Sequence, residues 1–469
     1  MIKKNMEILP NDIGALQALV RQLLAENAAL KAKIAELKAR LQTDSHNSHK
    51  PPSSDGLRKR PALPKPRGRK QGGQPGHRGK TLKMVRHPDK TILCKPEVCS
   101  CGVSLQDTPG TVIERRQVFD LPEPKLDVTE YQRLRCQCPA CGMTHAGVFP
   151  SYVKAPTQYG AGVLAFASLL NTGYMMPFKK VQGLFADLFG YAVNEGTLVS
   201  ANTIAYDALA PSEAIMKTQL RTAPVCHFDE TGIRVEGKLH WQHVVSSPSA
   251  TYLFVHAKRG MLALNSPDSL LPAYHGWAVH DCWASYFGYA SCRHALCGAH
   301  LLRELTAVAE QGSPWASQMH TLLLTLYRHS AFGTTTVSYP QRWSQLYDTL
   351  CHRAQREEPP PTRGHRRGKA TRTKGRNLLE RLMKHKQAVL AFAMYAEVPF
   401  TNNQAERDLR PVKVKQKISG CFRTLVGAQH YARISSFLST ARKQHRHVFK
   451  ELRRVFLGDS FLIQAVSAK

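Results

Sequence analysis

Three acidic residues of this chain stand in settings that are suited to binding metal ions. Asp229 and Asp281 each end a short apolar run that is typical of a β-strand. Glu406 follows Asn402 and Asn403, which can cap the start of a helix. Hard divalent cations take oxygen ligands, and two Mg²⁺ ions about 4 Å apart can activate one oxygen and stabilise another at a single phosphate. Two strand-end aspartates and a later helical glutamate therefore predict a two-metal site for phosphoryl transfer.

Each acid also has an interpretation that involves no metal. Asp229 could belong to a strand-to-turn segment, and Asp281 could cap a helix that starts near Cys282. Glu406 could pair with Arg410 one helical turn further on. The order of the three acids in a strongly basic chain favours the metal site over three separate explanations.

The composition indicates a polyanionic partner. The chain has 469 residues, of which 42% are hydrophobic, so it has room for about three domains. Its 65 Lys and Arg residues outnumber 34 acidic ones, and the formal net charge of +31 attracts nucleic acid. No apolar run approaches the roughly 20 residues of a membrane-spanning helix, and the N-terminus lacks a signal-peptide core. We therefore expect a cytoplasmic, nucleoid-associated protein that binds double-stranded DNA and no membrane.

Residues 1–45 carry a heptad repeat, the pattern of a leucine-zipper coiled coil. One core position is occupied by Ile13, Val20, Asn27, Ile34 and Leu41, and the other by Leu16, Leu23, Leu30 and Leu37. β-Branched residues at the first position with leucine at the second favour two parallel strands, and a single asparagine fixes their register. The alternative is an amphipathic helix that packs on its own domain. We expect a homodimer or higher oligomer through Leu16, Leu23, Asn27, Leu30 and Leu37.

Residues 46–90 predict a basic, disordered linker. They are rich in serine, proline, glycine and basic residues and cannot bury enough apolar surface to become ordered. Such a segment could lie along DNA phosphates or in a minor groove, or serve as a solvated linker, and both roles can hold together. The residues expected to contact DNA here are Arg58, Lys59, Arg60, Arg67, Arg69 and Lys70.

Residues 91–150 hold six cysteines, which predict a zinc-binding ribbon. Cys138 and Cys141 are separated by two residues and followed by glycine, the form of a knuckle that presents two thiolates to one zinc ion. Cys99 and Cys101 are also followed by glycine but have one residue between them. The alternative is a set of unrelated free thiols. We assign structural Zn²⁺ to Cys99, Cys101, Cys138 and Cys141, with Cys94 or Cys136 as substitutes.

Residues 151–220 are expected to be helical. An apolar helix over 162–170 precedes two helical segments, 181–189 and 194–202, that are joined at Gly190. This helix–turn–helix pattern fits a DNA-binding pair and also an ordinary αα-hairpin, which is the commoner structure. The second segment lacks lysine and arginine, which disfavours its insertion into a DNA groove.

Residues 221–445 change to strand patterning and predict a ribonuclease-H-like catalytic domain. Three meandering strands are followed by a fourth that ends at Asp281, which is the order that opens this α/β fold. The gap between Asp281 and Glu406 is longer than a minimal fold needs, so residues 300–395 are interpreted as a helical insertion. The whole chain is thus expected to be a multidomain α/β protein that ends in a basic tail, residues 446–469. The expected strands cover 225–229, a hairpin over 232–245 that turns at Glu236 and Gly237, 251–256 and 277–280.

Four segments of the chain resemble one known family. They are 227–232, His-Phe-Asp-Glu-Thr-Gly; 278–286, Ala-Val-His-Asp-Cys-Trp-Ala-Ser-Tyr; 297–304, Cys-Gly-Ala-His-Leu-Leu-Arg-Glu; and 402–411, Asn-Asn-Gln-Ala-Glu-Arg-Asp-Leu-Arg-Pro. With the coiled coil, basic linker and zinc ribbon before them, they resemble the large transposase of the IS66 insertion-sequence family, which belongs to the DDE superfamily. The resemblance implies a ribonuclease-H-like fold with Asp229, Asp281 and Glu406 as the metal-binding catalytic acids.

One pair within these segments has no assigned role. Cys297 and His300 are one helical turn apart and could bind a metal ion. A buried cysteine and a hydrogen-bonded histidine are the commoner arrangement.

Basic residues follow Glu406 on its helix. Arg407 and Arg410 could contact the phosphates that flank the reactive one, with a solvated helix face as the alternative. Lys413 and Lys415 continue the segment that is expected to contact DNA. Pro411 lies between them and is expected to stop or kink the helix.

The features together predict a DNA transposase. Water would cut the DNA at an element end and free a 3′-hydroxyl, which would then attack a target phosphate at the same site. The expected cofactors are two Mg²⁺ ions, with Mn²⁺ as a substitute, and structural Zn²⁺; small accessory proteins are a further candidate partner. One rival is a non-catalytic zinc-ribbon regulator, which explains the charge and the cysteines but not residues 402–410. Another is a nuclease of the same fold that hydrolyses DNA without joining it.

Overall fold

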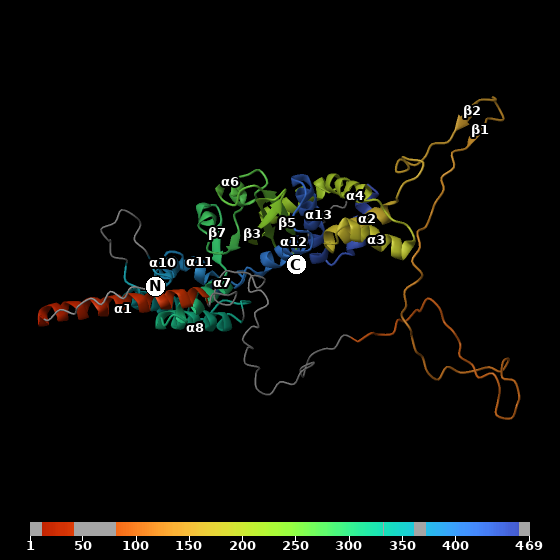
Figure 1. Cartoon of the computed structure of the whole chain (residues 1–469). Helices are drawn as coiled ribbons and strands as arrows, with labels where there is room; N and C mark the ends of the chain where they lie inside the picture. The colour runs from red at the N-terminus through yellow and green to blue at the C-terminus, as the bar shows by residue number, and fades with distance from the viewer. Residues whose placement is uncertain (1–11, 42–80, 332, 361–371, 459–469) are drawn as a thin grey trace, which may run out of the picture. The chain divides into compact units, whose positions relative to one another are not determined.

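The structure, a computed structural model, describes residues 12–41, 81–331, 333–360 and 372–458 (Figure 1). It confirms the mixed α/β class, with one mixed five-stranded sheet and many helices. The chain divides into two compact units, each of which is described by itself. The larger unit contains residues 1–56, 132–186 and 191–469, and the smaller one contains residues 57–131 and 187–190.

The N-terminal heptads form one long helix, α1 (Ile13–Leu41). Its first turn is capped by Asp12, whose Oδ2 accepts a hydrogen bond of 2.9 Å from the Ala15 N–H. The heptad leucines Leu23 and Leu30 are 54% and 61% exposed in the single chain. Pairing of two such helices stays a prediction.

The central sheet has the strand order β5-β4-β3-β6-β7. The first three strands in sequence pair antiparallel, and β6 and β7 run parallel to β3. The hairpin between β3 and β4 turns at Glu236 and Gly237, whose φ angles of 51° and 73° suit the tight turn predicted there. The strands are β3 (Val225–Val235), β4 (Lys238–Ser246), β5 (Thr251–His256), β6 (Trp277–His280) and β7 (Arg293–Leu296).

One expectation about the strands was wrong. The sequence predicted a strand that ends at Asp229 and a separate hairpin strand from residue 232, but β3 is continuous from Val225 to Val235. Antiparallel pairing with β4 runs through Thr231 and Gly232 without a break. Asp229 therefore lies in the middle of a strand, although it lies just beyond the last residue pair of β3 with β6.

Alternation along the strands gives the sheet two differently covered faces. Val225 and Ile233 of β3 point to one face, and Cys226 and Phe228 point to the other. The first face carries two hydrophobic clusters. One joins β6 and β7 to the helices that follow them, and the other joins β3, β4 and β5 to two later helices. The other face is covered by Leu220 and by the segments between β5 and β7.

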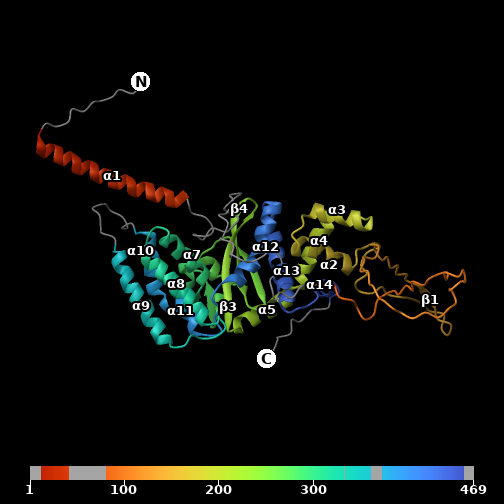
Figure 2. The same cartoon turned by 90° about the horizontal axis from the view of Figure 1, so that it is seen from below.

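The helices expected between residues 300 and 395 are present around the first of these clusters. Figure 2 shows them and the two later helices, α12 and α13, as separate groups beside the strands. The helices of the first group are α7 (Gly298–Ala309), α8 (Pro314–His329), α9 (Pro340–Glu357), α10 (Lys374–Lys384) and α11 (Lys386–Met394). The later helices are α12 (Asn403–Ser419) and α13 (Leu425–Lys443). The remaining short elements are α6 (Met261–Leu264), η3 (Leu271–Ala273) and η4 (Ala284–Gly288).

α12 runs through its internal proline. Of the two effects expected of Pro411, a stop or a kink, the stop is absent, because α12 continues to Ser419. It ends at Gly420, whose φ of 75° favours glycine. The helix thus presents more than two turns of surface beyond Glu406.

Residues before the sheet pack with the last helices of the chain. α2 (Ala161–Ser168) and α4 (Glu195–Ala208) share a cluster with α13 and with α14 (Val448–Phe456), which lies within the segment expected to be a tail. The other elements of this region are the π-helical η2 (Leu169–Gly173), α3 (Phe178–Phe189) and α5 (Ala210–Thr222). A short hairpin, β1 (Arg135–Gln137) and β2 (Thr144–Ala146), precedes them. Among the described residues, no helix combines the length and hydrophobicity that crossing a bilayer requires.

Candidate active site

The strand register places Asp229 and Asp281 side by side. β3 and β6 pair in parallel with an offset of 52 residues, as between His227 and Val279, and the two aspartates differ by the same offset. Asp281 therefore follows the end of β6 at the level of Asp229. The last residue pair of the two strands is His227 and Val279, and each aspartate follows its member of that pair by two residues. Side chains two residues apart on a strand share a face, so both aspartates belong to one face of the sheet. This is the face that carries the helical insertion and α12.

Asp229 interacts with three other carboxylates. Burial raises its pKa well above the ordinary value, and the charges of Glu230, Asp281 and Glu406 raise it further. The Glu230 N–H, which donates a 2.8 Å hydrogen bond to Asp229 Oδ1, acts in the opposite direction. The structure thus brings Asp281 and Glu406 within electrostatic reach of Asp229. A cation bound between them would relieve the repulsion.

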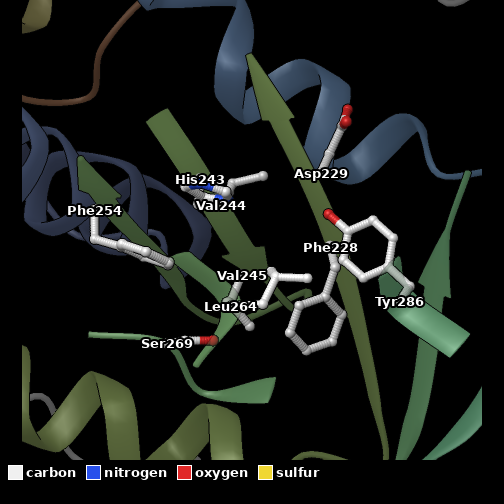
Figure 3. A pocket seen from close by; sticks show the side chains of 9 residues that line it. All are labelled: Phe228, Asp229, His243, Val244, Val245, Phe254, Leu264, Ser269 and Tyr286. Atoms are coloured by element: carbon white, nitrogen blue, oxygen red, sulfur yellow. The ribbon is translucent and has the colours of Figure 1, made fainter. Parts of the chain in front are cut away.

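The other face of β3 offers no room for a substrate. Figure 3 shows Asp229 directed away from the apolar side chains of Phe228, Val245 and Leu264 that line a cavity there. The cavity has a volume of about 10 Å³, which is enough for one water molecule at most. Any substrate must therefore approach Asp229 from the face with α12.

Asp281 is held by its own backbone neighbourhood. Its Oδ1 accepts a 2.9 Å hydrogen bond from the Trp283 N–H. The helix cap considered from the sequence was wrong, because the next helix, η4, begins at Ala284 with Trp283 at its N-cap and no side-chain cap. The preceding His280 is fully buried, and burial lowers its pKa to about 3. Its Nε2 lies 2.9 Å from His294 Nδ1, which ties the end of β6 to β7.

Glu230 fixes the segment after Asp281 to β3 from the opposite face. Its buried carboxylate forms a 2.7 Å ion pair with Arg259 and accepts a hydrogen bond from the Tyr286 hydroxyl. Burial raises the pKa of Glu230, and these two partners oppose that rise. The Arg259 guanidinium also lies 4.3 Å from the ring centroid of Trp283. The chain on both sides of Tyr286 is thereby anchored to the strand that carries Asp229.

Asn402 holds the start of α12 against β3. Its Nδ2 donates a 2.9 Å hydrogen bond to the Phe228 carbonyl, and its Oδ1 lies 2.9 Å from His227 Nδ1. Its backbone N–H donates a 3.1 Å hydrogen bond to Cys297 Sγ at the start of α7. The side chain makes no cap to its own helix, contrary to expectation. Its three bonds instead bring Glu406, one turn later, to the side of Asp229.

A second anchor lies two residues beyond Glu406. Asp408 Oδ2 accepts hydrogen bonds from Ser246 (2.6 Å), Thr251 (2.9 Å) and Lys443 (2.8 Å). Burial opposes the charged form of Asp408, but the Lys443 ammonium and the hydroxyl donors prevail and hold its pKa below the ordinary value. α12 is thus bonded to β4, β5 and α13 as well as to β3.

Glu406 also meets the pair whose role the sequence left open. One ligand atom each of Cys297, His300 and Glu406 lies within 4.8 Å of the others, and His300 Nδ1 is 3.8 Å from Glu406 Oε1. Burial raises the pKa of the Cys297 thiol to about 11, against the backbone N–H groups that point at its sulfur. Sequence spacing joined Cys297 to His300, but only the fold adds Glu406.

The two halves of the predicted zinc ribbon form similar turns that differ in length by one residue, each within its own unit. The Cys99 N–H donates to the Val103 carbonyl, and the Cys138 N–H donates to the Met143 carbonyl, both at 2.8 Å. Backbone N–H groups within each turn lower the pKa of the first thiol, most strongly that of Cys101 for Cys99 and that of Cys141 for Cys138. Assembly of Cys99, Cys101, Cys138 and Cys141 around one zinc ion stays a prediction.

The basic residues after Glu406 fall into two groups. Arg407 and Arg410 are exposed on α12. Lys413 donates a 2.8 Å hydrogen bond to the Gly232 carbonyl. Burial lowers the pKa of Lys415 to about 8, and its ammonium lies over the rings of Phe422 and Tyr431. The arginines are therefore the better placed to reach DNA, and the predicted contacts of Arg58, Lys59, Arg60, Arg67, Arg69 and Lys70 lie outside the described residues.

Comparison with known families gives the class of this protein. A basic chain whose mixed α/β sheet gathers carboxylates at one face fits enzymes that act on nucleic acid. A model of the transposase IS66 family matches residues 156–430, more than half of the chain. The chain belongs to the IS66 transposase family, as its motifs predicted. A second model, of a family of unknown function (DUF6444), matches residues 7–83, and no curated protein matched.

Proposed function

We propose that this chain is a DNA transposase whose reaction takes place at Asp229, Asp281 and Glu406. The main support is the position of these three acids, which are far apart in sequence. The register of β3 and β6 aligns the two aspartates, and the contacts of Asn402 bring Glu406 to the same face of the sheet. Three antiparallel strands followed by two parallel ones, in the order β5-β4-β3-β6-β7, also fit a ribonuclease-H-like fold of the DDE superfamily.

The three acids fit a pair of Mg²⁺ ions, with Mn²⁺ as a substitute. The donors are carboxylate oxygens, which these hard cations prefer. Glu406 Oε1 is buried and has no hydrogen-bond partner among the described residues, and Asp229 lies in a field of like charges. When bound, such ions lower the pKa of water and stabilise charge on the attacking and leaving oxygens.

The residues of the chain then have separate tasks in two successive reactions. In the first, water attacks a phosphodiester at an element end and the P–O3′ bond breaks, which leaves a 3′-hydroxyl. In the second, that hydroxyl attacks a phosphodiester of the target, one P–O bond forms and another breaks, and the DNA strands are joined. Arg407 and Arg410 bind the flanking phosphates, while Asn402 and Glu230 hold the acids in place.

The other modules supply the DNA-binding and pairing functions. The basic residues from Arg58 to Lys70 and the zinc ribbon hold DNA, and α1 pairs two chains so that two element ends can be brought together. A nuclease that does not join strands and a regulator that does not cut remain as rivals.

A gel assay with the full chain separates these possibilities. DNA that carries the terminal sequences of the encoding element is incubated with Mg²⁺ and a target plasmid. We expect cut ends and then joined products in the presence of Mg²⁺ and neither in its absence. Cutting without joining would indicate the nuclease, and binding without cutting would indicate the regulator.

A further inference from the structure

A group of three metal-ligating side chains lies where the first turns of α7 and α12 meet. Cys297 precedes α7, His300 lies in its first turn, and Glu406 lies in the first turn of α12. Their nearest ligand atoms all lie within 4.8 Å of one another. We infer that Cys297, His300 and Glu406 form a binding site for a zinc-class divalent ion, distinct in its ligand chemistry from the all-carboxylate site.

The fold brings the two helix starts together through backbone contacts. The Gly298 N–H donates a 2.8 Å hydrogen bond to the Phe400 carbonyl, and the Asn402 N–H donates one of 3.1 Å to Cys297 Sγ. A Cβ on residue 298 would collide with the ring of Phe400, so glycine is required for this approach. The sulfur is thereby held at a fixed place, 1% exposed, with the Asn402 N–H directed at it.

The ligand set selects the ion. Thiolate, imidazole and carboxylate are the three side-chain ligands of zinc, and sites with three protein ligands keep a fourth position open. Mg²⁺ binds thiolate and imidazole poorly, so the sulfur discriminates against the ion expected between the aspartates. The His300 and Glu406 side chains are 17% and 31% exposed, which leaves the site open to solvent on one side.

Sharing of Glu406 has a functional consequence, which rests on the proposed function. A carboxylate that is bound to zinc beside Cys297 is withheld from the ion that Asp229 shares with it. Zinc is therefore expected to inhibit Mg²⁺-dependent cutting by occupying this site.

The metal content of the full chain tests the site without any activity measurement. The unaltered chain, Cys297→Ser and His300→Gln are loaded with Zn²⁺, dialysed and analysed for zinc per chain. Cys351→Ser is the matched control, because Cys351 is also a buried cysteine, 3% exposed against 1% for Cys297, and lies on α9. We expect both site variants to hold one zinc ion fewer than the unaltered chain and the control to hold the same number.

Equal zinc content in His300→Gln, Cys297→Ser and the unaltered chain would overturn the inference. If Cys297→Ser does not fold, as judged by circular dichroism, His300→Gln decides alone, because its partly exposed side chain tolerates replacement more readily. Loading with Co²⁺ adds a second measurement. The thiolate-to-cobalt absorption should lose intensity in Cys297→Ser and not in Cys351→Ser.

Cutting assays then separate this inference from the proposed function. At fixed Mg²⁺, the zinc concentration that halves cutting should rise about tenfold or more in His300→Gln, the loss expected for one ligand. A chain that loses zinc on substitution but never cuts DNA would keep the site and refute the proposed function. If the chain cuts DNA but the substitutions leave its zinc content unchanged, the proposed function stands and the zinc site is refuted.

Discussion

At the scale of single residues, Asp229 is a carboxyl group whose surroundings strongly disfavour its charged form. It is half-buried, and Glu230, Asp281 and Glu406 all disfavour its charged form. An enzyme retains such a group when a ligand that is absent from the bare chain compensates it. Glu230, next in sequence, adds to this repulsion, but its own carboxylate is paired with Arg259 and Tyr286.

The raised pKa of Asp229 should make the free energy of unfolding depend on pH. Its pKa in the folded chain is raised above the unfolded value of about 3.9, so the folded state holds the proton more tightly. In metal-free buffer, the free energy of unfolding should therefore fall as pH rises from about 4 through the folded pKa. Asp229→Asn should flatten this fall and raise the melting temperature at neutral pH. Thermal unfolding at several pH values measures both effects.

Asp268→Asn is the control for this measurement. The Asp268 side chain is 58% exposed, and its ion pair with Lys217 is 3.9 Å long. Its substitution should leave the pH profile unchanged. Superimposable profiles of Asp229→Asn and the unaltered chain would show that Asp229 is not strained by its neighbours.

Substitution of Asn402 should lower both stability and cutting. Asn402→Ala leaves the Phe228 carbonyl and His227 buried without their partner, which should cost about 1–3 kcal/mol of stability. Because the residue positions Glu406, cutting should fall further than the loss of folded protein explains. Asn403→Ala, an exposed neighbour on the same helix, should change neither quantity. Equal activity per folded molecule in the two variants would contradict a positioning role.

At the scale of elements, α12 is the piece that completes the site. It begins at Asn402, bonded to β3, and its second turn carries Asp408, bonded to β4, β5 and α13. Glu406 lies between these anchors. The helix is therefore fixed on both sides of the residue that it delivers.

The Asp408 anchor can be removed with one substitution. Asp408→Ala leaves the Lys443 ammonium buried without its counter-ion, which typically costs about 3–5 kcal/mol. Chemical denaturation should show this loss as a lower midpoint, and Asp268→Ala should show none. A loss well below 1 kcal/mol would mean that α12 does not depend on the buried pair.

The sequence predicted those elements whose patterns are local. Strands 251–256 and 277–280 and the turn at Glu236 and Gly237 were found with their observed bounds, because apolar runs and a glycine turn carry their own signal. The continuity of β3 was missed, since Thr231 and Gly232 resemble a break when their pairing with β4 is unknown. The sequence could not decide whether Pro411 stops its helix or only kinks it, because the contacts of α12 with β3 and β4 are not visible in the sequence.

The candidate site also has parts that the sequence predicted and parts that it could not. The three acids could be chosen from residue type and setting, and the family from their motifs. The partners of Asn402 could not, since it bonds to a carbonyl 174 residues earlier. The addition of Glu406 to Cys297 and His300 likewise depends on a contact between two helices that are distant in sequence.

At the scale of the whole molecule, a strongly basic chain carries a group of carboxylates at one face of its central sheet. The charge of +31 gives non-specific affinity for DNA, and the carboxylates keep the reacting site itself locally acidic. α1 exposes its heptad leucines in the single chain. Such a stripe is expected to be covered by a second copy.

Disruption of the stripe should change the oligomeric state. Leu23→Lys with Leu30→Lys places two charges in the predicted seam and should convert dimer to monomer in light scattering after size exclusion. Ala18→Lys with Ala25→Lys places the same charges on the outer helix face and should leave the dimer intact. A monomeric unaltered chain, or a dimer that survives the first pair of substitutions, would contradict the coiled coil.

The central claim is that three acids form one metal-dependent site that cuts DNA. Its most direct test compares cutting of end-containing DNA by the unaltered chain, Asp229→Asn and Asp268→Asn in Mg²⁺, with DNA binding measured on the same samples. We predict that Asp229→Asn binds DNA normally but cuts it at least about a thousandfold more slowly, which corresponds to ~4 kcal/mol in the activation barrier. Asp268→Asn should cut and bind like the unaltered chain. Undiminished cutting by Asp229→Asn would contradict the central claim.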